Sequence, residues 1–151
     1  MIRPLALAMT LATTGITPAL AADLVERKSQ HTVAETIDRL EAAVTAAGAT
    51  VFARIDHAAG AKKVNADLRP TEVLIFGNPA LGTPAMQDGQ TAGLDLPLRV
   101  LAYENATGEV IVAYHDPASL AQMHGLPADA AYLAKMTGAL DGLTGKAIAA
   151  E

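Results

Sequence analysis

The chain has 151 residues, of which 51% are hydrophobic and 18% are charged, and its formal net charge is −5. This length and composition predict one globular domain with its own core. The negative charge and the small aromatic content, two Phe and three Tyr with no Trp, argue against a nucleic-acid partner. Because the chain has no cysteine, disulfides, thiol catalysis and cysteine-ligated metal centres are excluded.

The first 21 residues have the pattern of a secretory signal peptide. Arg3 supplies a positive charge, residues 5–20 are apolar or small, and Ala19 and Ala21 form a small-x-small cleavage site. A membrane anchor is the alternative, but Pro18 interrupts the apolar run, which is shorter than the ~20 residues needed to span a bilayer. We expect export to the periplasm or the medium, and a mature single domain over residues 22–151 without membrane contact.

The mature chain begins with a weak strand and a well-marked helix. Residues 24–31 are polar for a strand and indicate an edge position. Thr32 and Glu35 form a T-x-x-E capping box, and Gly48 marks the end of the helix. Between them, apolar residues recur at helical spacing: Val33, Ile37, Leu40 and Val44. This one-sided helix is expected to lie on a sheet.

The middle of the chain predicts two strands with a short helix between them. Residues 50–56 alternate like a half-buried strand and bring Asp56 and His57 to its end. Residues 58–70 predict one short helix. The four consecutive apolar residues at 73–76 are typical of a strand in a sheet interior.

The C-terminal half begins with a segment rich in glycine and proline, residues 77–88, which is interpreted as a loop or short helix. Two apolar runs around a turn that contains Asn105 and Gly108 then predict a hairpin. A brief helix follows Asp116, and a last helix starts near Pro127. The residues after 141 show too little periodicity to assign.

In this order the elements predict an α+β domain, with five strands in one mainly antiparallel sheet and the major helices on one face. The other face then needs a cover, and the strands carry apolar residues on both faces. We therefore expect a homodimer.

Five short motifs in this chain resemble a known bacterial family. They are IDH at 55–57, FGNP at 76–79, GTPAMQ at 82–87, LDLPLRV at 94–100 and YHDP at 114–117. Over residues 28–126 the chain resembles the family catalogued as domain of unknown function 302. The resemblance implies a TATA-binding-protein-like β-α-β(4)-α fold, often homodimeric, and no established activity, substrate or cofactor. Residues 127–151 are interpreted as a C-terminal helical extension of this core.

Two groups of polar residues are candidates for a site. Asp56 and His57 are the only adjacent acid and imidazole, although a His at a strand end more often anchors the next loop. Asn78, Thr83 and the nearby glycine N–H groups are interpreted either as a polar nest for a carboxylate or phosphate or simply as a stiff turn.

The sequence predicts no metal site and no cofactor. Methionine and histidine would suit a soft metal such as copper, but no two of them have the spacing of ligands. His31 and His124 are interpreted as surface residues.

The leading hypothesis is an exported, homodimeric binding domain in which His57 and residues 77–88 line a cleft for a small ligand. The alternative is a small hydrolase- or lyase-type enzyme that uses His57 as a general base, with Asn78 or Thr83 orienting the substrate. Both hypotheses require that the strands before His57 and before residue 77 run parallel. An antiparallel return would separate the two groups by a strand length, roughly 20 Å.

Overall fold

The computed structural model describes residues 24–150, so the predicted signal peptide lies outside the described residues. The strands are β1 (Leu24–Lys28), β2 (Thr50–Asp56), β3 (Thr71–Gly77), β4 (Leu98–Glu104) and β5 (Val110–His115). They form one sheet in the order β1-β5-β4-β3-β2, and every neighbouring pair is antiparallel. The predicted edge strand and the predicted hairpin, β4 and β5, are both present.

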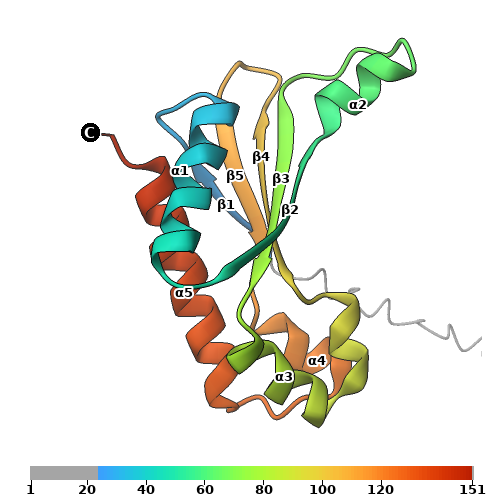
Figure 1. Cartoon of the computed structure of the whole chain (residues 1–151), viewed down its shortest axis with the longest axis vertical. Coiled ribbons are helices and arrows are strands. Elements are labelled where there is room, and N and C mark those ends of the chain that lie inside the picture. The colour runs from blue at the N-terminus through green and yellow to red at the C-terminus, as the bar shows by residue number, and fades with distance from the viewer. Residues whose placement is uncertain (1–23, 151) are drawn as a thin grey trace, which may run out of the picture.

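The helices are α1 (Val33–Ala46), α2 (His57–Lys63), α3 (Pro79–Asp88), α4 (Ser119–His124) and α5 (Ala131–Ile148), with a 3-10 helix, η1 (Gln90–Leu94). Helices α1 and α5 lie side by side against one face of the sheet (Figure 1). The domain is therefore α+β with an antiparallel sheet, as the sequence predicts. Without the short helices, the order is β-α-β(4)-α.

Helix α1 begins at the predicted capping box. The Glu35 N–H donates to Thr32 Oγ1 at 3.3 Å, and the Thr32 N–H donates to Glu35 Oε2 at 3.0 Å. Its apolar face packs into the main core with side chains of the sheet and of α5, including Leu74, Phe76, Val100, Val112 and Leu140.

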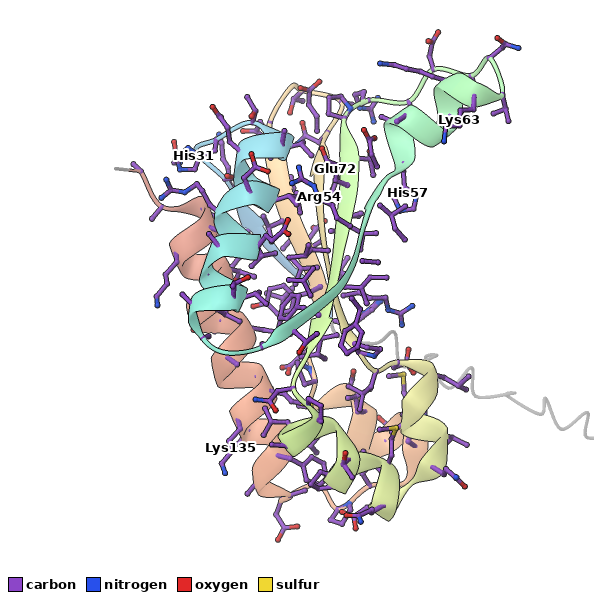
Figure 2. All side chains as sticks on the ribbon, viewed as in Figure 1. His31, Arg54, His57, Lys63, Glu72 and Lys135 are labelled. Atoms are coloured by element: carbon purple, nitrogen blue, oxygen red, sulfur yellow. The ribbon has the colours of Figure 1, made fainter. Side chains whose placement is uncertain are left out.

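Arg54 of β2 also ties α1 to the sheet (Figure 2). Its guanidinium contacts Glu72 of β3 at 2.7 Å and Asp38 of α1 at 2.5 Å. Hydrogen bonds to these two carboxylates raise the pKa of Arg54. These ion pairs tie the C-terminal half of β2 to its neighbouring strand β3 and to α1.

The last helix is longer than the sequence indicates, because α5 continues to Ile148. Gly138, Gly142 and Gly145 interrupt the pattern from which periodicity is judged, and each lowers helix propensity by about 1 kcal/mol relative to alanine. Leu143 and Ala147 are nevertheless buried in the main core. This tertiary burial outweighs the low local propensity, so α5 completes the core.

Residues 77–88, predicted as a loop or short helix, mostly form α3. Together with η1, α4 and the start of α5, this helix builds a second apolar cluster at one end of the sheet (Figure 1). At the opposite end, α2 and residues 64–70 project beyond the sheet, and Val64 and Leu68 are exposed there.

The second face of the sheet has no helix over it within residues 24–150 (Figure 1). Side chains alternate along a strand, and Leu74 and Phe76 face the helices, so Val73 and Ile75 face the other way. The register places Leu101 and Ala113 beside them. Val73, Ile75 and Leu101 remain partly exposed. Among the described residues, none of the helices combines the length and hydropathy of a transmembrane span.

Candidate ligand-binding cavity

His57 and Asn78 lie at opposite ends of the sheet. Strands β2 and β3 are antiparallel, with Asp56 opposite Glu72 and Thr50 opposite Gly77. The segment between the strands is therefore a hairpin-like return, and a strand length of roughly 20 Å separates the two groups. The prediction that His57 and residues 77–88 form one site is wrong.

Asp56 and His57 start helix α2. The Ala59 N–H donates to Asp56 Oδ1 at 2.8 Å, which makes Asp56 the N-cap of this helix. His57 is the first helical residue, and its side chain is exposed beside α2 (Figure 2). The enzyme hypothesis in which His57 works with Asn78 or Thr83 is excluded by this geometry.

A cavity of about 190 Å³ lies where β3 runs into α3. Its walls come from β2, β3, α3, the segment before β4, and α5. Nearly all of the lining is apolar, and the larger side chains are Phe52, Leu81, Met86, Leu96, Leu98 and Met136. Asn78 and Thr83, two of the predicted site residues, also line this cavity.

An irregularity in β2 places Phe52 at the mouth of the cavity. The pairing with β3 shifts between Val51 and Ala53, so Phe52 is the extra residue of a β-bulge. Its side chain is 56% exposed. Gly77 lies between Phe52 and Pro97, because a Cβ there would be 3.8 Å from Cε2 of Phe52 and only 3.3 Å from Cβ of Pro97. The bulge and this close approach together shape the opening.

The polar groups of the cavity do not form an anion-binding nest. The Ala80 N–H donates to Asn78 Oδ1 at 2.9 Å, and the N–H groups of Leu81 and Gly82 donate to the Asn78 carbonyl at 2.9 and 3.0 Å. These donors are therefore already used by the start of α3. None of the residues that line the cavity is ionisable. Of the two interpretations of this segment, the stiff turn that leads into a helix fits the structure and the nest for a carboxylate or phosphate does not, although Asn78 and Thr83 do line the cavity.

The sequence interpretation missed a polar cluster around His124. Its Nε2 lies 2.8 Å from Asp95 Oδ2 and its Nδ1 lies 3.1 Å from Thr91 Oγ1. Because an ionised carboxylate only accepts, Nε2 donates to Asp95, and in the neutral imidazole Nδ1 then accepts from the Thr91 hydroxyl. The side chain is 7% exposed, so His124 is not the surface residue that was expected. No local pattern could reveal partners that are 29 and 33 positions away.

One tyrosine next to α3 has a perturbed ionisation. Tyr132 of α5 donates a hydrogen bond to Asp88 Oδ2 at 2.8 Å. Desolvation, followed by the hydrogen bond and the charge of Asp88, raises the pKa of Tyr132 to about 12. Within residues 24–150, no group of three or more His, Asp or Glu side chains is arranged to hold a metal ion.

Several known proteins are similar to this chain. The crystal structure of an uncharacterized conserved protein DUF302 from Bacillus stearothermophilus has a TM-score of 0.74 and 20% identity, and the likeness covers 84% of this chain and 99% of that one. This likeness shows the shared fold.

Closer sequence relatives occur in Brucella. A protein of Brucella suis named fluoride-specific ion channel FluC 1 is 52% identical over 117 residues, which are 76% of this chain and 46% of that protein. Fluoride-specific ion channel FluC 2 of Brucella melitensis has the same identity over the same length, with 43% of that protein covered. The chain thus spans less than half the length of these relatives.

The family model named domain of unknown function DUF302 matches residues 25–143. This match includes the motifs at 55–57, 76–79 and 114–117 that carry the resemblance, and it runs on through most of α5. The chain belongs to the family of domain of unknown function DUF302.

Proposed function

We propose that this domain binds a small, mainly apolar organic molecule in the cavity at the β3–α3 junction. The observation that carries the proposal is the cavity itself, which has a volume of about 190 Å³ and is lined by residues of β2, β3, α3 and α5. Apolar cavities of ~150 Å³ in other proteins bind benzene, so this one fits a ligand of roughly ten non-hydrogen atoms or fewer. An apolar wall with a few fixed polar groups is the usual composition of small-molecule sites.

The side chains around the cavity support this proposal. Met136, which is almost fully buried, comes from the core side, whereas Phe52 and Met86 are exposed. Exposed apolar side chains next to an apolar cavity leave that surface in contact with water, and a bound apolar molecule would remove part of it from water.

The test is binding of small aromatic probes, followed by amide chemical shifts. Gly82 lines the cavity, and the nearest atoms to a Cβ there, in Leu96 and Met86, are 3.9 and 4.0 Å away, so Gly82→Leu projects a side chain into the space. Gly138→Leu is the matched control, because Gly138 is also helical and has open space around it. We expect Gly82→Leu to abolish binding and Gly138→Leu to bind like the wild type. If no probe shifts resonances of cavity residues, the proposal is wrong.

We further propose that a second copy of the chain covers the open face of the sheet. The centre of this face is apolar, and Glu26, Lys28 and Arg99 lie on the same side of the sheet by register. Because both signs of charge occur around one apolar patch, a two-fold axis can bring unlike charges together. A membrane surface or a nucleic acid would instead favour one sign.

Export is the remaining part of the proposal and is supported by the pattern of residues 1–21. Intact mass spectrometry of the protein recovered from the cell envelope tests it. We expect cleavage after Ala21 or Ala22, and a protein that retains residues 1–21 would contradict it.

A second candidate function is suggested by the names of the Brucella relatives. We propose that the domain acts beside a fluoride channel, as a module attached to it or separate from it. Growth of a deletion strain in raised fluoride tests this idea, with complementation by the wild type and by Gly82→Leu. Sensitivity that only the wild type restores would support it, and unchanged growth would contradict it.

A further inference from the structure

We infer that the cavity selects an uncharged carbonyl compound, whose oxygen accepts hydrogen bonds from the Asn78 amide and the Thr83 hydroxyl. This inference rests on the proposed function and names the ligand class for the same cavity. It covers small ketones, aldehydes, esters and amides of roughly ten non-hydrogen atoms or fewer.

The lining of the cavity decides against a charged ligand. None of the lining side chains is ionisable, so neither a carboxylate nor an ammonium group would find a counter-charge. An unpaired ion in apolar surroundings loses its hydration without compensation. The N–H groups at the start of α3 do not replace a counter-charge, because they already donate to Asn78.

Asn78 and Thr83 are exposed residues that line the cavity, and the free group of the Asn78 side chain is a donor. Its Oδ1 already accepts from the Ala80 N–H at 2.9 Å, which orients the amide plane. Within residues 24–150, neither the Asn78 NH₂ group nor the Thr83 hydroxyl has a hydrogen-bond partner in the protein. A carbonyl oxygen only accepts hydrogen bonds and has two lone pairs, so it is the ligand group that suits donors of this kind.

The residue type at position 78 agrees with this assignment. Asp and Ser cap helices about as well as Asn, so capping by itself does not require an amide. The difference between Asn and Asp here is the NH₂ donor. Asn78→Asp is therefore a variant that keeps the cap and removes the group assigned to the ligand.

Three probes of matched size test the inference: acetophenone, ethylbenzene and benzoate. Their dissociation constants are measured by NMR titration with the wild type, Asn78→Asp and Thr83→Val. We expect the wild type to bind acetophenone at least tenfold more tightly than ethylbenzene or benzoate. Each variant should lose about tenfold in acetophenone affinity, a typical effect of one hydrogen bond, while ethylbenzene binding is unchanged. The amide resonance of Ala80 in Asn78→Asp reports whether the cap is retained.

The outcomes separate this inference from the proposed function. Binding of ethylbenzene without any preference for acetophenone, or equal acetophenone affinity in all three proteins, overturns the ligand class and leaves the cavity as a binding site. Benzoate binding as tight as that of acetophenone also overturns it. If none of the three probes binds, both the proposed function and this inference are wrong.

Discussion

His124 illustrates how one side chain links two elements of this domain. It joins α4 to η1 through Asp95 and Thr91 while nearly buried. Replacing it with alanine removes two hydrogen bonds, and we expect His124→Ala to lower the free energy of unfolding by about 1–2 kcal/mol in urea titrations. His57→Ala is the control, because that imidazole is exposed, and its effect should stay within about 0.5 kcal/mol. Equal effects of the two substitutions would contradict the role assigned to His124.

The raised pKa of Tyr132 should make the free energy of unfolding depend on pH in the alkaline range. The pKa of Tyr132 is raised to about 12 from the usual tyrosine value of 10.0, so the neutral phenol is favoured in the folded state. The stabilisation is fully present below pH 10 and is lost as the pH rises through the folded pKa near 12. We expect the stability difference between the wild type and Tyr132→Phe to change between these two pH values. Ultraviolet titration should show one tyrosine ionising after the others. If this late ionisation is still present in Tyr132→Phe, its assignment to Tyr132 is wrong.

Helix α5 forms despite three glycines, which leaves room for stabilising substitutions. A Cβ at Gly138 or Gly142 meets no atom within 4 Å. Gly138→Ala and Gly142→Ala should each raise the free energy of unfolding by about 0.5–1 kcal/mol, because alanine favours the helix and restricts the unfolded chain. Gly89→Ala should be destabilising, since its Cβ would lie 2.8 Å from the His124 carbonyl oxygen. Denaturant melts of the three variants decide this, and a loss of stability in both α5 variants would argue against the helix.

The capping box at the start of α1 should make the stability of the domain depend on acidic pH. Hydrogen bonds from the Thr32 backbone and side chain lower the pKa of Glu35. A depressed carboxyl pKa contributes stability above its unfolded value of 4.5, which is lost as the pH falls through the folded pKa. Thr32→Ala should cost about 1 kcal/mol at neutral pH. We expect this difference to narrow below pH 4.5, and thermal melts over that range would show whether it instead stays constant.

The assembly of the whole molecule can be tested with two neighbouring residues. Val73 faces the open side of the sheet, whereas Leu74 is fully buried under the helices. Val73→Lys should give a folded monomer in sedimentation, because it places a charge in the proposed interface but outside the core. Leu74→Lys should prevent folding, since it buries an unpaired charge. A wild type that sediments as a monomer at micromolar concentration would remove the dimer proposal.

Local patterns in the sequence were sufficient for the fold class, the capped helix α1 and the β4–β5 hairpin, because each depends on residues a few positions apart. Asn78 and Thr83 were also found from local turn chemistry, and both line the cavity. Phe52 and Met136 were not found as cavity residues, because a bulge and a long-range helix contact bring them there.

Long-range pairing decided the rest. The segment between β2 and β3 is long enough for either a parallel crossover or an antiparallel connection. Only the antiparallel register shows that His57 and Asn78 are far apart. The length of α5 and the partners of His124 likewise depend on burial against distant segments. Local dihedral preferences are weak compared with the free energy of forming a shared core, so tertiary packing chose among arrangements that the local sequence permits equally well.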